Sequence, residues 1–314
     1  MQNLVFALSL VVPVFLIVAL GYILKKLGMI NENFVTVSSK IVFNISLPAL
    51  IFFEISIMDL DEVLNIGLIT FVYVGTLISF IAAWIVAESI AETGKDKASF
   101  IQGSFRGNFA IVGLAIIANY YGAENLGKAS LVLAFTIPLY NVLSVIALTL
   151  PFRKEKNLNY KTTFSKIARN PLIIGVLVAI PFSYFKIKIP DVIHTTGSYL
   201  SALSLPLALL GIGGFLSFSD IAQRSFLTII STLFKLIIIP AVATFAAYLL
   251  NFKGMDLGII FILFACPTAI ASFIMAEAMG ANSRLAANIL LLTTLASVVT
   301  MTLGLFILKE NGLI

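Results

Sequence analysis

The sequence predicts an all-helical integral membrane protein of ten transmembrane helices, built as two five-helix repeats of opposite orientation. Its composition is the first observation: of 314 residues, 60% are hydrophobic and 11% are charged, and the mean hydropathy is +1.07. A soluble domain would carry about 25% charged residues. The other two observations are ten long apolar stretches and a repeat of short motifs at an offset of 158 residues.

The apolar stretches set the number and type of the spans. A bilayer core about 30 Å thick needs about 20 mostly apolar residues per helix. Helices are expected because backbone exposed to lipid must satisfy its hydrogen bonds within its own segment. The first span is not a cleaved signal peptide, because no basic residue precedes it. The expected spans are 5–24, 37–57, 63–87, 98–120, 126–150, 170–187, 193–217, 225–249, 256–279 and 283–308.

The repeat divides the chain into residues 1–150 and 170–314, joined by a basic cytoplasmic linker at 151–169. Each unit holds five spans, an odd number, so the second unit must enter the membrane from the opposite side. Inverted repeats of this kind are a recurring plan among secondary transporters. The matched residues are Pro13 and Pro171, Pro48 and Pro206, and Gly122 and Gly280.

The basic residues predict the orientation. With the N-terminus outside, thirteen basic residues lie in or beside cytoplasmic loops and five lie in outer loops, a positive-inside bias that places both termini outside. A prokaryotic inner or plasma membrane is the expected location. The thirteen are Lys25, Lys26, Lys40, Lys95, Lys97, Arg153, Lys154, Lys156, Lys161, Lys166, Arg169, Arg224 and Arg284, and the five are Lys128, Lys186, Lys188, Lys253 and Lys309.

The fourth and ninth spans contain residues that interrupt a helix. The fourth has Gly107 and Asn108 in an apolar stretch, and the ninth has Pro267 at the matching place. Proline removes a helical hydrogen bond, glycine eases unwinding, and irregular backbone at membrane depth must be covered by protein or line a cavity. The alternative is that Pro267 only kinks its helix and Gly107 only permits close packing.

Two breaks at matching places of inverted halves would cross near the membrane midplane. Their half-helix N-termini would concentrate free N–H groups and positive dipole there, which suits an anion. The side chains of Asn108 and Thr268 are expected to add hydrogen bonds. The expected binding residues are Arg106, Gly107, Asn108 and Phe109 in the fourth span and Pro267, Thr268 and Ala269 in the ninth.

Charged residues inside the spans are further candidates. Lys235 lies near mid-depth of the eighth span, where a Lys costs about 2.5–3.5 kcal/mol. It is expected to line an anion path or mimic a bound cation, or else to bind a carbonyl or an acid within the bundle. Arg106 is expected to attract a carboxylate or to satisfy carbonyls freed by the break. Glu277 is a candidate for coupling, although it lies close enough to the interface to reach water.

Three polar residues, Asn44, Tyr140 and Asn141, are candidates for lining the cavity or for making interhelical hydrogen bonds. No cofactor, metal site or disulfide is expected, because the chain has one cysteine, Cys266, and one histidine, His194. The net charge of +5 is distributed over short loops, so no nucleic-acid partner is expected.

Several short motifs occur in an order that resembles the auxin efflux carrier family over essentially the whole chain. This family contains plant PIN transporters and bacterial malonate- or malate-type carriers. Each motif is weakly specific alone, and their order and spacing carry the resemblance. The motifs are Val12–Phe15 through Gly21 and Tyr22, Leu27 and Gly28, Asn44–Leu50, Phe105–Phe109 with Gly113, Tyr121 and Gly122, Asn170–Leu172, and Pro267 with Ala276, Glu277 and Gly280.

The resemblance implies a scaffold part and a moving part, with helices four and nine crossing at the substrate site. It also implies carriage of small organic anions, such as mono- or dicarboxylates or auxin-like acids, by alternating access. Asn108 and the break at Pro267 match the family's crossing residues. The chain departs from the pattern in lacking a proline at the fourth-span crossing and in having the small residues Ala271 and Ser272 after Pro267, which leaves the substrate open.

Other functional classes make different demands on the sequence. A sodium-coupled symporter of the bile-acid type would need clustered oxygen ligands, and the spans offer only scattered Ser, Thr and Asn. An enzyme would need a catalytic arrangement that the spans lack, so none is expected. A uniporter driven by the membrane potential is allowed, because no pair of acids lies mid-membrane. The expected partners are the lipid bilayer and a small organic anion; proton or sodium coupling and a homodimer are left open.

Overall fold

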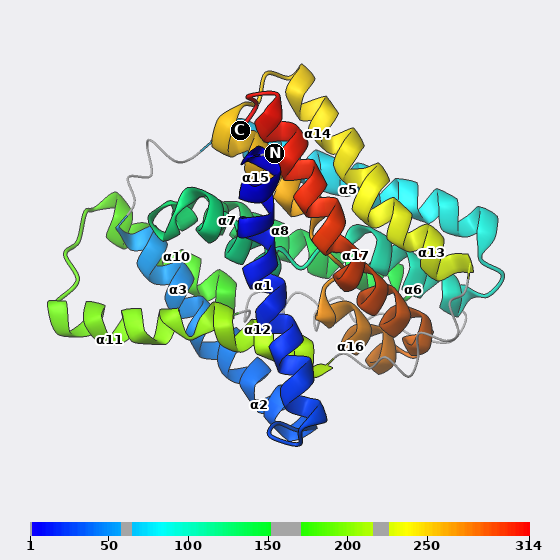
Figure 1. Cartoon of the computed structure of the whole chain (residues 1–314), viewed down its shortest axis with the longest axis horizontal. Helices are drawn as coiled ribbons and strands as arrows, with labels where there is room; N and C mark the ends of the chain where they lie inside the picture. Colours follow the sequence, from blue (N-terminus) through cyan, green and yellow to red (C-terminus); the bar gives the residue numbers. More distant parts are fainter. Residues whose placement is uncertain (1, 58–64, 152–170, 216–225) are drawn as a thin grey trace.

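The computed structural model of the chain describes residues 2–57, 65–151, 171–215 and 226–314 (Figure 1). Every regular element in these ranges is a helix, and an isolated antiparallel bridge joins Gly107 to Thr268. Seven of the described helices are long and apolar enough to cross a membrane. They are Ala7–Lys26, Glu32–Phe53, Ile66–Ile90, Leu126–Ala147, Asp191–Phe215, Phe226–Leu249 and Ser283–Glu310.

The elements follow one another as α-helices with a few short π-helical or 3-10 turns, marked η. In chain order they are α1 (Gln2–Lys26), α2 (Glu32–Ile41), η1 (Val42–Ser46), α3 (Leu47–Ser56), α5 (Ile66–Ile90), α6 (Gly94–Phe105), η2 (Phe109–Gly113), α7 (Leu114–Tyr121), η3 (Ala123–Asn125), α8 (Leu126–Ala147), α10 (Pro171–Tyr184), α11 (Asp191–Ala202), α12 (Ser204–Phe215), α13 (Phe226–Leu233), η6 (Phe234–Ile238), α14 (Ile239–Leu249), α15 (Gly254–Ala265), α16 (Ile270–Met279) and α17 (Ser283–Glu310).

The predicted spans can be compared with these helices one by one. Seven of them fall on the seven long helices. The fourth falls on α6 and α7 and the ninth on α15 and α16, each pair being separated by a break, and the sixth falls on the 14-residue α10. The second helix begins at Glu32, before the predicted residue 37, because polar residues can extend a helix beyond its apolar stretch. The predicted linker, from residue 152 onward, lies outside the described residues.

Two glycines that match in the sequence repeat end equivalent helices. Gly122 follows α7 with φ of 90°, and Gly280 follows α16 with φ of 78°. A residue with a Cβ rarely adopts this left-handed region, so glycine is favoured where a helix stops sharply. The two positions, 158 residues apart, therefore share a backbone requirement as well as a residue type.

The helices pack in two groups. The first group comprises α1, α2, α3, α10, α11 and α12, and the second comprises α5 to α8 and α13 to α17. In Figure 1, α3, α10 and α11 lie at the left and α5 and α13 at the right. The groups meet where α1 packs on α17 and α3 packs on α8. Each group contains helices from both halves of the chain.

The same packing occurs twice with the halves exchanged. Helix α1 packs on α12, and α10, which lies 158 residues after most of α1, packs on α3. In the second group, α7 packs on α8 and α16 packs on α17. Helices α7 and α16 end 158 residues apart, at Tyr121 and Met279.

Large apolar side chains are exposed on the outside of the bundle. Leu16, Ile85, Val242 and Phe245 are each more than 60% exposed and come from three different long helices. A soluble protein rarely exposes so many large apolar residues, whereas a lipid-facing surface needs them. The exposed surface thus agrees with the composition of the chain.

Small residues allow α1 and α12 to approach closely. A Cβ on Gly213 would lie 1.8 Å from the carbonyl oxygen of Val18, and a Cβ on Gly21 would lie 2.2 Å from the carbonyl oxygen of Leu210. Both obstacles are backbone atoms, which cannot rotate away. Close contact through small residues is a typical means of helix association in membranes.

We therefore expect Gly213→Ala to destabilise the protein by about 1–3 kcal/mol, because the added methyl forces the two backbones apart. Thermal unfolding in detergent measures the effect. The neighbouring Gly214→Ala is the matched control: its methyl would meet the side-chain ends of Val35 and Ile30, which have some freedom to shift. Equal losses in the two variants would contradict the explanation.

Candidate functional site

The two interrupted helices meet at their breaks. Helix α6 ends at Phe105 and the chain becomes helical again at Phe109; α15 ends at Ala265 and α16 begins at Ile270. The two broken segments run antiparallel and exchange backbone hydrogen bonds. The N–H of Asn108 donates to the carbonyl of Pro267 at 2.7 Å, and the N–H of Ala269 donates to the carbonyl of Arg106 at 3.2 Å. This pairing is called the crossing below.

Side chains satisfy backbone groups that the breaks set free. The carbonyls in the last turn of a helix have no intrahelical partner. At the end of α6, the carbonyl of Gly103 accepts a hydrogen bond from Thr268 Oγ1 at 2.7 Å. At the end of α15, the carbonyl of Phe264 accepts one from Lys235 Nζ at 3.0 Å. Each half-helix is thus closed by a residue from the second half of the chain.

Both hydrogen-bond donors of Thr268 are engaged within the crossing. Its hydroxyl proton is engaged with Gly103, its N–H donates to Thr293 Oγ1 at 3.1 Å, and the residue is 1% exposed. An anion needs a donor, and both donors of Thr268 are already engaged. Thr268 therefore holds the crossing together and does not donate to a ligand in this arrangement.

Lys235 is the most deeply buried cation at the crossing. It lies in the π-helical turn η6 and is fully buried. Its ammonium group borders Gly107, where an added Cβ would lie 3.1 Å from Nζ. Among the described residues no carboxylate lies within 4 Å of it. Of the expectations for Lys235, the carbonyl contact is the one found.

Arg106, the second cation, contacts helices α8 and α16. Its guanidinium donates to Ser144 Oγ and to Asn141 Oδ1, each at 3.0 Å, and contacts Met275 Sδ. No described carboxylate pairs with it, and its side chain does not bond the carbonyls freed by the break. All of its described partners are neutral, so its positive charge is uncompensated there.

A band of polar groups on α8 lies beside Arg106. Tyr140, Asn141 and Ser144 share one face of this helix, as residues three and four apart do. The Tyr140 hydroxyl lies close to Gly107 and to Thr76 of α5 without making a hydrogen bond of normal geometry. Tyr140 is 4% exposed and Thr76 is 1% exposed. The two hydroxyls are unpaired polar groups next to the crossing.

Asn108 and Phe109 begin the second half of the fourth span. Asn108 is 6% exposed, and among the described contacts its side chain makes no hydrogen bond, so the amide is available. Phe109 is buried, and its ring fills the space that a Cβ on Gly113 would occupy. The N–H groups that begin η2 and α16 point positive dipole ends at this region.

Of two further predicted residues, Asn44 is not brought to the crossing, and Glu277 is described only in its backbone. Asn44 is exposed in η1, within the first helix group, and donates to the carbonyl of Lys40 on its own helix at 2.7 Å. This hydrogen bond spans one helical turn, so the amide finds its partner within its own helix. This contact was not predicted from the sequence. Glu277 belongs to α16, but its side chain lies outside the described part of the structure.

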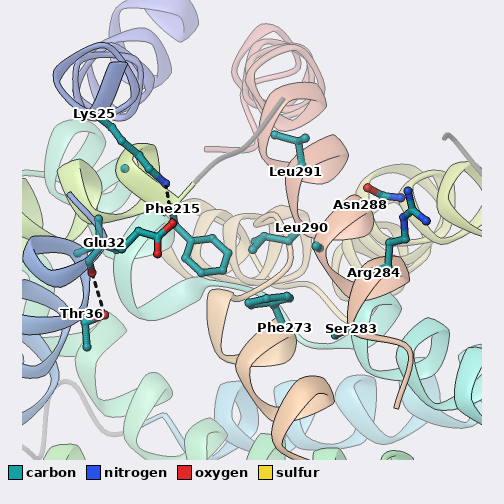
Figure 2. Close-up of a pocket in the computed structure, with 13 residues that line it drawn as sticks. Lys25, Glu32, Thr36, Phe215, Phe273, Ser283, Arg284, Asn288, Leu290 and Leu291 are labelled. Atoms are coloured by element: carbon teal, nitrogen blue, oxygen red, sulfur yellow. Dashed lines mark hydrogen bonds and ion pairs between the residues drawn. The ribbon is translucent and has the colours of Figure 1, made fainter. Parts of the chain in front are cut away.

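Two cavities of about 540 Å³ each lie between the helix groups. The first is lined by the ends of α1, α12 and α17 together with α2 and α16, and Figure 2 shows it. The second is lined mainly by α1, α3, α7, α11 and α12. The lining described for either cavity does not include residues 106–109 or 266–269. Residues 107–109 and 266–269 are buried in this conformation, and Arg106 is half-buried.

The described residues contain no group of three or more His, Cys, Asp or Glu side chains that could hold a metal ion. Cys266 is buried at the crossing beside Gly107 and Gly113. The polar chemistry available here is that of two cations, amides, hydroxyls and backbone N–H groups. This arrangement can bind an anion.

The family model for "Membrane transport protein" matches residues 6–305. The chain belongs to this family, the auxin efflux carriers. An uncharacterized transporter from Methanocaldococcus jannaschii is 26% identical over 315 residues, covering 96% of this chain and 98% of the relative. An uncharacterized transporter from Methanothermobacter thermautotrophicus is 24% identical, covering 93% and 95%. This auxin efflux carrier family member is therefore a multi-pass membrane transporter.

Several residues of this carrier's crossing were missed by the sequence analysis. Ser144 and Met275 contact Arg106, and Thr293 receives the N–H of Thr268. The spacing of Ser144 after Tyr140 and Asn141 on one helix was a usable signal. No sequence signal pointed to Thr293, because buried Ser and Thr residues are common along α17 and only the packing shows which of them lies at the crossing.

We expect Thr268→Val to destabilise the carrier by about 1–2 kcal/mol, because the carbonyl of Gly103 loses its donor in an enclosed site. Thermal unfolding in detergent is the measurement. Thr302→Val is the control: Thr302 is also buried, but its hydroxyl bonds the carbonyl of Val298 within an unbroken helix, where that carbonyl keeps its backbone partner. A loss in Thr302→Val as large as in Thr268→Val would contradict this role.

Proposed function

We propose that this carrier is a secondary transporter of small organic anions, such as mono- or dicarboxylates or auxin-like acids, that works by alternating access around the crossing. The observation that carries the proposal is the pair of cations, Arg106 and Lys235, in an enclosed site where no described carboxylate compensates them. A buried uncompensated cation is costly in a membrane protein and marks a functional site. A carboxylate substrate supplies the missing negative charge.

The groups proposed to bind the carboxylate follow from what is free at the crossing. Asn108 offers its amide N–H, the starts of η2 and α16 offer backbone N–H groups, and Tyr140 offers an unpaired hydroxyl. Arg106 supplies the charge together with Asn141, which orients the guanidinium. Gly107, Pro267 and Ala269 shape the site through backbone pairing rather than through side-chain contacts.

We also propose ten spans in two inverted repeats, residues 1–150 and 170–314, with both termini on the outside. The support is the match of helix ends at an offset of 158 and the packing that recurs with the halves exchanged. Both chain ends lie at the top of the molecule in Figure 1, and an even number of crossings requires the two ends to be on the same side. The first helix group would be the fixed scaffold and the second, which holds the crossing, the moving part.

Movement of the second group would expose the crossing alternately to the two cavities between the groups. Each cavity already lies on the interface that must slide. The π-helical turn η2, which directly follows the fourth-span break, contacts α12 of the first group, and π-bulges are frequent at functional sites. The carrier would thereby bind its substrate from one side and release it to the other.

Asn108→Ala is expected to reduce transport at least tenfold while folding and expression are retained, because a hydrogen bond to a charged ligand contributes about 1.5–3 kcal/mol. The measurement is charge movement and radiolabelled uptake in proteoliposomes, screened over small carboxylates with and without pH and sodium gradients. Asn44→Ala is the matched control, since Asn44 bonds only its own helix in the described structure. Unchanged uptake of a verified substrate by Asn108→Ala would refute the site.

Lys235 is proposed to act as a fixed cation in place of a coupling metal ion. Its ammonium group donates a hydrogen bond to the carbonyl of Phe264, which the break leaves without a helical partner. Backbone oxygens of this kind coordinate a coupling sodium ion in other transporters. This favours an anion carrier driven by a proton gradient or the membrane potential over a sodium symporter. Proton coupling through Glu277 is compatible with the proposal.

Transport is accordingly expected to persist when sodium is replaced by N-methylglucamine, and Lys235→Ala is expected to reduce it more than Glu54→Ala. The reason is depth: Lys235 is fully buried at the crossing, whereas Glu54 lies near the end of its span in the sequence. Initial uptake rates of the three proteins are the measurement. A strict sodium requirement, or equal losses in the two variants, would contradict the fixed-cation role.

A further inference from the structure

The first cavity, hereafter the vestibule, is defined by Lys25, Glu32, Phe215, Phe273 and Arg284 (Figure 2). The first three come from the first helix group and the other two from the second. It lies at the end of the molecule away from the two chain ends, because Lys25 is at the far end of α1 and Arg284 at the start of α17 (Figure 1). The vestibule therefore sits on the interface between the proposed scaffold and moving parts.

The mouth of the vestibule carries cations on both walls. Lys25 extends from α1, and Arg284 extends from α17 on the other side, as Figure 2 shows. Arg284 is exposed and takes part in none of the three ion pairs found among the described residues. Lys25 pairs with Glu32 at 3.9 Å, a long contact to a carboxylate that is itself 91% exposed. A weak pair of this kind is easily exchanged.

Two aromatic rings form the floor of the vestibule. The rings of Phe215 and Phe273 meet edge to face, with centroids 5.0 Å apart. Phe215 ends α12 in the first group, and Phe273 lies in the first turn of α16, directly after the crossing. This aromatic contact joins the two helix groups. Phe273 follows Ala269 of the crossing by four residues, so the contact links the vestibule to the segment that forms the crossing.

The second cavity between the groups differs in charge. Its described lining, which includes Pro13, Asn119, His194 and Pro206, contains no Lys, Arg, Asp or Glu. The two entrances are therefore electrostatically unequal. A cleft lined by cations raises the local concentration of anions and the rate of their capture. An apolar cleft gives no such advantage.

We propose that the vestibule is a capture site for the carboxylate substrate, in which Arg284 and Lys25 bind the anion before the Phe215–Phe273 contact opens toward the crossing. The proposal rests on the proposed function and adds a second binding position and a preferred side of entry. Glu32 acts as an internal competitor, because its carboxylate holds Lys25 while the vestibule is empty. By the positive-inside prediction, this entrance faces the cytoplasm, so the anion is captured for export.

The proposal predicts opposite effects from two neutralising variants. Arg284→Gln removes an anion-binding charge and is expected to raise KM about two- to fivefold with little change in kcat. Glu32→Gln removes the competitor and is expected to lower KM by a similar factor. The measurement is uptake of a verified carboxylate by full-length protein in proteoliposomes. Lys188→Gln, in a cavity that shares no residue with the vestibule, controls for the loss of one charge and is expected to leave KM unchanged.

Salt and sidedness separate capture from a structural role. At 1 M salt, where the screening length is about 3 Å, the KM of Arg284→Gln is expected to approach the KM of the wild-type protein. It is also expected only when substrate is offered on the vestibule side, measured with oriented vesicles. Arg284→Lys, which keeps the charge, is expected to retain most of the affinity. An effect independent of salt and side would overturn the proposal.

Binding is also testable without transport. Phenylglyoxal modifies exposed arginines, and its rate at Arg284 can be followed by mass spectrometry of the corresponding peptide in detergent-solubilised protein. Malonate is expected to slow this modification, at lower concentration in Glu32→Gln, whereas neutral malonamide is expected to have no effect. Equal rates with and without malonate would overturn the capture site.

The outcomes distinguish this inference from the proposed function. If Asn108→Ala abolishes uptake but Arg284→Gln and Glu32→Gln leave KM unchanged, the crossing site stands and the vestibule proposal is refuted. If malonate protects Arg284 although no carboxylate is transported, the vestibule binds anions and the transport proposal fails.

Discussion

The structure depends on one constraint: backbone groups freed inside a membrane protein must find partners. Two helices are interrupted at matching places, and each break leaves carbonyls and N–H groups that lipid cannot satisfy. The breaks pair with each other through Asn108 and Ala269. The remaining carbonyls are closed by Thr268 and Lys235, which fixes where η6, α6 and α15 must lie. The second helix group is therefore organised around its least regular backbone.

The residues around the freed carbonyls also give the crossing its charge. The group that closes the carbonyl of Phe264 is the amine of Lys235, next to Gly107, and the guanidinium of Arg106 is a second basic group held by neutral partners. The half-helices then begin with their N–H groups in the same region. The same few residues thus satisfy the freed backbone groups and supply the positive charge that the proposed anion site needs, which explains why that site is compact.

The surroundings of the crossing suggest how an enclosed site can be reached. The cavities lie on the interface between the two helix groups, where α1 contacts α17 and α3 contacts α8, and the crossing lies within one group. In the proposed mechanism, sliding along that interface would change access without disturbing the hydrogen bonds of the crossing itself. The charged vestibule and the apolar second cavity make the two sides unequal, although the helix packing recurs with the halves exchanged.

The amino-acid sequence was sufficient to predict the membrane class, the helix positions to within about five residues and the two breaks, because apolar length and helix-breaking residues act locally. It also identified Arg106, Asn108 and Lys235 as unusual for their depth. Tertiary structure alone decided the partners: that Thr268 closes Gly103, that Asn44 stays on its own helix, and that Ser144, Met275 and Thr293 join the site. These contacts link residues up to 169 positions apart, and local sequence carries no record of which buried side chain meets which.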